Sequence, residues 1–309
     1  MGMLVKSTSI GVMAVFVLAA MSAVDAEVGF YIFGDSMYDN GMTLYNGVKG
    51  AGAQFWPYGE TYFKKPAGRY SDGLLIPDFV AEYAGLPFPK PYLLPGLNSY
   101  TNGINFASAG ACVLVETRPR TINIKMQVDY FRQMVQKMKQ QLGEAQATKT
   151  IYNEGGRKFA FQNIGPLGCM PSVKFMLGFQ GTCAQEPLSL AKMHNANFLA
   201  VVKKLQAQLP GFKYTVYDFY TSLYLRVLYG SRYGFQDSQT ACCGSGAFNG
   251  DFTCQKKGEN FTVCSNPSSY LWFDAGHPTQ KADAQFAREF WTGNANIVSP
   301  YNLKWLFSN

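Results

Sequence analysis

The stretch Val28-Gly29-Phe30-Tyr31-Ile32-Phe33-Gly34-Asp35-Ser36, near the N-terminus, decides the fold of this chain. Its residues up to Phe33 are mostly apolar, and the run stops at Gly34. A short apolar run that ends at a glycine is typical of a buried strand followed by a tight turn. Reacting groups gather at the carboxyl ends of the strands in an open parallel sheet. The stretch therefore predicts a strand over residues 28–33, with Ser36 at the end where a site would form.

Strands and helices alternate along the rest of the chain. Further strands are expected at residues 104–109, 158–164 and 214–219. Helices are expected at residues 77–83, 127–142, 188–209 and 279–291, and loops at residues 51–70, 87–102 and 240–269. This alternation predicts an α/β fold with a mostly parallel sheet in one domain.

Residues 1–26 have the features of a secretory signal peptide. Lys6 supplies a positive start, residues 10–20 form an apolar run, and Val24-Asp25-Ala26 fits the small-x-small cleavage rule. Cleavage would leave a single domain over residues 27–309. The apolar run is short for a membrane span, and no later stretch is apolar enough to be one. We therefore expect no transmembrane segment and a secreted protein, located outside the cell or in the cell wall.

The composition and charge narrow the class of partner. The chain has 309 residues, of which 47% are hydrophobic and 15% charged, so a sizeable core can form. Its net charge of +7 could suit nucleic acid or an anionic surface. The basic residues are scattered in small groups, however, which is typical of an ordinary solvated surface. We expect no nucleic-acid partner and a monomeric protein.

Seven cysteines in an exported chain predict disulfides. Cys169 and Cys183 enclose a short loop, and a bridge between them would stabilise the fold by about 3 kcal/mol. Two more bridges are expected among four further cysteines, whose pairing stays open because adjacent cysteines do not easily bridge each other: Cys242, Cys243, Cys254 and Cys264. A zinc site is the weaker interpretation because no CxxC pair or nearby histidine is present. Asn260-Phe261-Thr262 is a glycosylation sequon.

A serine becomes a nucleophile only when a base lies within hydrogen-bond reach. The chain has two histidines. His194 falls inside an expected helix, where a structural role is favoured. His277 lies in a loop before the last helix, and Asp274 precedes it by three residues. That spacing lets the carboxylate hold one imidazole nitrogen and leaves the other free for Ser36. Gly-Asp-Ser alone is a weak signal, but Ser36, Asp274 and His277 together predict a catalytic triad.

These motifs, with others between them, resemble the plant GDSL esterases and lipases of the SGNH hydrolase superfamily. The resemblance covers nearly all of the chain after residue 26. It rests on blocks in the family's order: Tyr31 to Ser36 with Asp39, Trp56-Pro57-Tyr58-Gly59, Gly68 to Gly73, Asn105 to Gly110, Gly156-Arg157-Lys158, Gly165 to Cys169, Ala241 to Gly244, and Asp274-x-x-His277-Pro278.

The resemblance implies a flavodoxin-like three-layer α/β/α sandwich, with Ser36 as nucleophile, His277 as base and Asp274 as its partner. By the same resemblance, the backbone N–H groups of Ser36 and Gly110 are the oxyanion donors. No metal or organic cofactor is implied. Trp56, Tyr58, Arg69 and Asp72 can be interpreted as the mouth of a substrate site, although a structural role in the loop is favoured.

One block of the family is missing. A strand ending in Gly-x-Asn-Asp, whose asparagine supplies a third oxyanion donor, should fall between Gly110 and Gly156, but no such sequence occurs in the chain. An internal deletion near residues 147–152 is therefore expected, and the sheet should lack one central strand. The strand at 28–33 must then pair with another strand, since unpaired buried backbone groups are costly. Loss of the donor typically costs about 10²–10³ in rate. Asn163 is a possible replacement.

The predicted function is hydrolysis of carboxylic esters of lipids or small acyl esters through an acyl-enzyme on Ser36. The same triad would serve an acyltransferase if an alcohol replaced water. The missing block also leaves open a non-catalytic member of the family.

Overall fold

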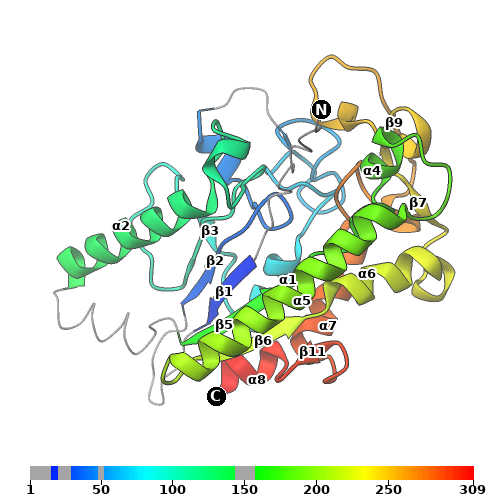
Figure 1. Ribbon diagram of the computed structural model, residues 1–309. Helices are drawn as coiled ribbons and strands as arrows, with labels where there is room; N and C mark the ends of the chain where they lie inside the picture. Colours follow the sequence, from blue (N-terminus) through cyan, green and yellow to red (C-terminus); the bar gives the residue numbers. More distant parts are fainter. Residues whose placement is uncertain (1–14, 20–28, 48–51, 143–156) are drawn as a thin grey trace, which may run out of the picture.

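A computed structural model describes residues 15–19, 29–47, 52–142 and 157–309. A seven-stranded sheet forms its centre (Figure 1). Across the sheet the order is β11 (Val298–Ser299), β6 (Lys213–Tyr217), β5 (Lys158–Gln162), β1 (Val15–Ala19), β2 (Phe30–Ile32), β4 (Ile104–Asn105) and β3 (Lys90–Pro91). Apart from β1 and the edge strand β11, these strands run parallel to one another. Strand β3 corrects the expectation of loop throughout residues 87–102, since two residues there pair with β4.

Helices cover both faces of the sheet, as the expected three-layer sandwich requires. The expected helices are present as α1 (Ile76–Tyr83), α2 (Ile124–Leu142), α5 (Gln185–Gln208) and α7 (Gln280–Thr292). Three helices were not expected: α4 (Pro171–Met176), α6 (Phe219–Leu228) and α8 (Leu303–Ser308). Strands β5 and β6 bury side chains against α5, and α1, α7 and α8 share the large cluster on the opposite side of the sheet. No helix in the described ranges combines the length and the hydropathy needed to cross a bilayer.

The strand expected at residues 28–33 is present over its central part as β2, which spans Phe30–Ile32, and residue 28 lies outside the described residues. Side chains alternate between the two faces of a sheet. Phe30 accordingly meets Phe307 of α8 on one face, while Tyr31 meets Phe131 of α2 on the other. Both faces of β2 are buried, and only a nearly continuous apolar run satisfies such a position.

Strand β1 fills the sheet position between β2 and β5. It runs antiparallel to both, with Ala19 opposite Phe30 and Leu18 opposite Phe159. The prediction that β2 must find another partner is thus confirmed. That partner falls within residues 1–26, the predicted signal peptide, so cleavage after Ala26 would remove it. The signal peptide remains a prediction, and the expected deletion near residues 147–152 lies outside the described residues.

Three disulfides tie down the loops beside the sheet. The predicted bridge between Cys169 and Cys183 is present. The open pairing resolves into Cys242–Cys264 and Cys243–Cys254, so each of the two adjacent cysteines reaches a different partner. The expected loop at residues 240–269 is partly ordered into short strands β8 (Cys243–Gly244) and β9 (Thr262–Val263), which pair with each other. The neighbouring strands β7 (Asp237–Ala241) and β10 (Tyr270–Trp272) pair in parallel.

Candidate active site

Ser36 lies just beyond the carboxyl end of β2, where the sequence places it. A tight turn holds it, because the Tyr38 N–H donates to the Asp35 carbonyl at 3.2 Å and the Met37 N–H donates to the Asp35 carboxylate at 2.9 Å. Gly34 has a φ of 150°, a backbone conformation that side chains disfavour. The glycine therefore lets the chain turn sharply out of the strand and present the serine.

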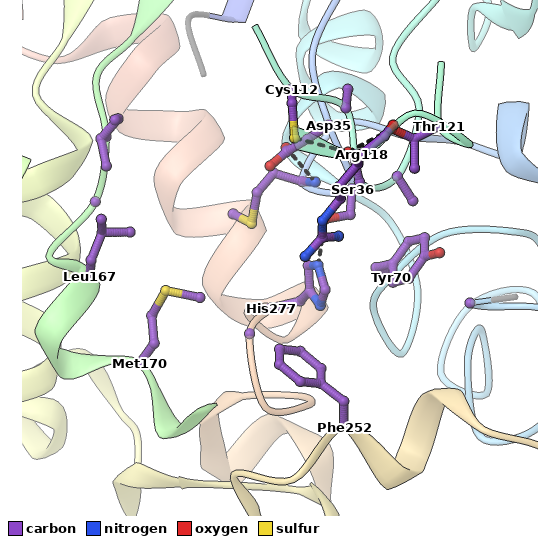
Figure 2. A pocket seen from close by; sticks show the side chains of 18 of the residues that line it. Asp35, Ser36, Tyr70, Cys112, Arg118, Thr121, Leu167, Met170, Phe252 and His277 are labelled. Atoms are coloured by element: carbon purple, nitrogen blue, oxygen red, sulfur yellow. Dashed lines mark hydrogen bonds between the residues drawn. The ribbon is translucent and has the colours of Figure 1, made fainter. Parts of the chain in front are cut away.

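His277 reaches this serine from the loop between β10 and α7. Its Nε2 atom lies 2.7 Å from Ser36 Oγ, and its Nδ1 atom lies 2.6 Å from Asp274 Oδ1. The same carboxylate oxygen accepts the backbone N–H groups of Gly276 and His277, each at 2.9 Å. The Asp-x-x-His spacing thus forms one turn that orients the imidazole. The structure brings the three predicted side chains together, and Figure 2 shows Ser36 and His277 facing each other.

The second oxygen of Asp274 is held by two residues whose part was not foreseen. The Tyr58 hydroxyl donates to Asp274 Oδ2 at 2.7 Å, and the Gln255 side-chain amide donates at 3.0 Å. Tyr58 is fully buried, and its ring packs against Phe273. The sequence suggests that Tyr58 shapes the mouth of a substrate site or has a structural role in the loop. In the structure, Tyr58 holds the Asp274 carboxylate that orients His277.

The charges in this group shift the pKa values in opposite directions. Burial alone would lower the pKa of His277, but the charge of Asp274 and its hydrogen bond outweigh burial and raise that pKa above the ordinary 6.5. Burial alone would raise the pKa of Asp274, but the facing imidazole and the Tyr58 hydrogen bond lower it below 3.8. Asp274 is therefore the ionised partner, which stabilises an imidazolium at His277.

Asp39 joins the turn after β2 to the chain after β4. Its carboxylate accepts the N–H groups of Gly41 and Met42 at 2.8 and 2.6 Å, and that of Ala109 at 2.8 Å. The next residue, Gly110, has a φ of +75°. The left-handed conformation favours glycine, which is the residue that the sequence has at this position. The family block containing Gly110 is thereby fixed next to Ser36.

Among the described residues, no acceptor forms a hydrogen bond with the backbone N–H of Ser36 or of Gly110. Asn163, the possible replacement donor, is engaged elsewhere. Its amide donates to Asp218 at 2.9 Å and accepts from the Tyr220 N–H at 2.9 Å, at the start of α6. Asn163 therefore positions α6 while it also lines the cavity with Ser36, and its part as a replacement donor stays a prediction.

A cavity of about 640 Å³ opens above these groups. Ser36 and His277 line it together (Figure 2), and Gly110 is also part of the lining. The rest of the lining is largely apolar and includes Met37, Ile164, Leu167, Met170, Phe219, Leu223 and Phe252. Apolar walls with a few convergent polar groups are typical of a site for a small organic ligand. The arrangement suits a ligand with a hydrocarbon part and one polar reacting group.

The remaining candidates have structural positions. Arg69 forms an ion pair with Asp78 at 2.7 Å, and Asp72 accepts the Gln280 N–H at the start of α7, also at 2.7 Å. Trp56 is 58% exposed. His194 lies on α5 beside Phe198, as its position in a helix suggests. The structural role is thus confirmed for Arg69 and Asp72, which do not shape the mouth of the cavity.

Comparison with known proteins decides the family. The model of the GDSL-like lipase/acylhydrolase family matches residues 30–142 and 122–290. This chain belongs to that family. The GDSL family is one of carboxylic ester hydrolases, and its three-layer α/β/α fold is the one described above. The family match spans the serine turn and the Asp-x-x-His loop, so the two halves of the site lie within it.

Plant proteins are among the relatives of this GDSL protein. It is 37% identical to a GDSL lipase of Tanacetum cinerariifolium, over 90% of this chain and 87% of the relative. It is 35% identical to GDSL esterase/lipase 1 of Arabidopsis thaliana, over 91% of this chain and 90% of the relative. The second alignment runs over 337 positions, more than the 309 residues of this chain. The relative therefore has residues without a counterpart here.

One relative bears on activity. The chain is 33% identical to a protein of Arabidopsis thaliana named inactive GDSL esterase/lipase-like protein 25, over 89% of this chain and 73% of the relative. The family thus includes a member named as inactive. Membership by itself does not assign a working site, and the function has to be argued from the geometry of this chain.

Proposed function

We propose that this chain is a secreted serine esterase that hydrolyses carboxylic esters of lipids or small acyl esters. The observation that carries the proposal is the unbroken chain of contacts from Ser36 Oγ to His277 to Asp274, at 2.7 and 2.6 Å. A nucleophile, a base and an orienting carboxylate at these distances form the arrangement used in acyl transfer. Its position on the wall of an apolar cavity supports a substrate with a hydrocarbon part.

In the proposed mechanism, Ser36 Oγ attacks the ester carbonyl carbon and gives its proton to His277 Nε2. The carbonyl electron pair moves onto oxygen, and the N–H groups of Ser36 and Gly110 donate hydrogen bonds to the oxyanion that forms. The C–O bond to the alcohol then breaks, and the leaving alkoxide takes the proton from His277. Water repeats these steps on the acyl-enzyme, which releases the acid and restores Ser36.

The proposed location outside the cell is supported by the N-terminal features and by the three disulfides, since such bridges persist in oxidising compartments. Asn260 is exposed, so the sequon is accessible for glycosylation. We further propose a monomer acting on a small-molecule or lipid ester, without a nucleic-acid partner and without a cofactor.

Two alternatives to the esterase are an acyltransferase and a non-catalytic member of the family. An acyltransferase results if an alcohol attacks the acyl-enzyme in place of water. A non-catalytic member is favoured by two observations, the absent Gly-x-Asn-Asp block and the inactive relative. The cavity and the contacts of His277 favour the esterase, because a protein that only binds a ligand does not need an activated serine.

The test is covalent labelling of the secreted protein with a fluorophosphonate, beside a Ser36→Ala control. We expect labelling of the unaltered chain and none of the control, because only an activated serine attacks the phosphorus atom. Hydrolysis of p-nitrophenyl esters, measured with and without added alcohol, separates esterase from acyltransferase. A folded chain that stays unlabelled would establish the non-catalytic alternative.

A further inference from the structure

Arg118 is the strongest unexplained feature of the site. It lies on the loop after Gly110, and its side chain reaches into the cavity that Ser36 and His277 line (Figure 2). Neither the triad nor the family blocks account for it. Arg118 is exposed, so water solvates its charge until a ligand enters the cavity.

The guanidinium lies next to the proposed oxyanion donor. A Cβ atom on Gly110 would lie 3.2 Å from Arg118 Nη1, so the guanidinium stands within reach of the Gly110 backbone. Its charge also acts on Asp35, whose pKa is raised by burial and lowered in turn by Met37 N–H, His277 and Arg118. Arg118 therefore stands at the nucleophile end of the cavity, beside Ser36 and close to Gly110 (Figure 2).

The positive charge is not taken up by a direct ion pair. Within the part of the chain that the structure describes, no carboxylate lies within 4.0 Å of the Arg118 guanidinium. The buried arginines Arg69 and Arg226 do have such a partner, in Asp78 and Glu289 respectively. An unpaired guanidinium is available to a negative charge that forms during the reaction.

We propose that Arg118 is a third oxyanion donor, which replaces the asparagine of the missing block. The inference rests on the proposed esterase function. In the tetrahedral intermediate the former carbonyl oxygen carries a full negative charge, and the N–H groups of Ser36 and Gly110 supply two donors. Arg118 supplies a third, with a positive charge. The side chain is exposed in the empty site, and a bound ester excludes water from it and so strengthens the interaction.

The role is catalytic because the guanidinium would touch the reacting oxygen, and it differs from recognition of an anionic substrate. Donors aimed at an oxyanion act on the transition state and leave the binding of the neutral ester unchanged. A substrate without charge, such as p-nitrophenyl butyrate, separates the two roles. Removal of an oxyanion donor lowers kcat, whereas loss of a ground-state contact raises KM.

The experiment compares Arg118→Met and Arg118→Lys with the unaltered chain on p-nitrophenyl butyrate. We expect kcat to fall about 10²–10³-fold in Arg118→Met, with KM unchanged. Arg118→Lys should recover much of the loss, because the ammonium keeps the charge. The matched control is Arg132→Met, an exposed arginine on α2 that pairs with Asp129, and we expect it to leave kcat unchanged. Equal urea midpoints of all variants would show that folding is intact.

Two results would overturn the inference. The first is an unchanged kcat in Arg118→Met, and the second is a loss that appears only in KM. Fluorophosphonate labelling of the same samples separates this failure from failure of the esterase itself. If Ser36 is labelled at equal rates in the unaltered chain and in Arg118→Met, the esterase stands and the role of Arg118 falls. If the unaltered chain is not labelled, both proposals fall.

Discussion

Two neighbouring regions of this molecule differ in how closely they follow the family pattern. On the side of β2 that pairs with β4, the turn that carries Ser36 is held in place and the predicted triad is assembled: Ser36 meets His277, which meets Asp274. On the side that faces β5, the neighbour of β2 is the N-terminal strand β1, and the block with Gly-x-Asn-Asp is absent. The site is therefore complete on one side and altered on the other.

The difference is instructive because the complete side is held by the chain that follows β4 and by helix α2. The Ser108 N–H donates to the Gly34 carbonyl at 3.1 Å, and the side chain of Gln127 forms hydrogen bonds with both backbone groups of Gly34. These contacts do not use β1. The serine turn can thus keep its geometry while the strand on its other side changes. Such a change removes the third oxyanion donor, and we assign that role to Arg118.

The largest expected effect concerns the complete side. Asp274→Asn removes the charge that holds the imidazole in its working tautomer. We expect kcat for a p-nitrophenyl ester to fall about 10⁴-fold while the fold persists. Steady-state kinetics on the purified variant measure this. A loss of less than tenfold would mean that the Asp274 carboxylate does not orient the working base, and that the triad on this side is not what makes the site complete.

The next prediction concerns the altered side. A chain that starts at Glu27 lacks β1, so the facing edges of β2 and β5 lose their hydrogen-bond partner. Each buried backbone group left unpaired costs about 1–3 kcal/mol. We therefore expect a clearly lower urea midpoint than for the chain that retains residues 1–26. Equal midpoints of the two chains would show that β1 does not contribute to the sheet.

A third prediction uses the pH dependence of the complete side. His277 acts as base only when neutral, and its pKa is raised above 6.5 by Asp274 despite burial. The value of kcat/KM should therefore fall on the acid side of a midpoint that lies above 6.5, by about tenfold for each pH unit. A pH profile measured on a neutral ester checks this. A midpoint below 6.5 would show that the carboxylate does not dominate the histidine.

The smallest expected effect is that of Tyr58→Phe. This change removes one of the two donors to Asp274 Oδ2 and leaves the ring in place. Loss of a hydrogen bond to a buried carboxylate typically costs about 1–3 kcal/mol, so the urea midpoint should fall modestly. Gln255 still donates to the same oxygen, and kcat should fall far less than in Asp274→Asn. An equal loss of kcat in both variants would make Tyr58 as important as the carboxylate itself.

The sequence by itself determined the features that depend on local pattern. The apolar run before Gly34 predicted β2 and the place of Ser36, and the Asp-x-x-His spacing predicted the turn that joins Asp274 to His277. The helices expected at residues 127–142, 188–209 and 279–291 match α2, α5 and α7 to within a few residues. The bridge between Cys169 and Cys183 also followed from spacing. In each case the residues that interact lie close together in the chain, or the period of the pattern carries the signal.

Only the tertiary structure decided the features that join distant segments. The Tyr58 hydroxyl contacts Asp274, which lies 216 positions away in the sequence, and no local sequence pattern predicts such a contact. The pairing of Cys242 with Cys264 required the geometry of the loops. The neighbour of β2 and the placement of Arg118 beside Gly110 were also undetermined, because strand order and side-chain direction depend on how the whole sheet closes. Long-range packing selects among partners that the sequence leaves equally available.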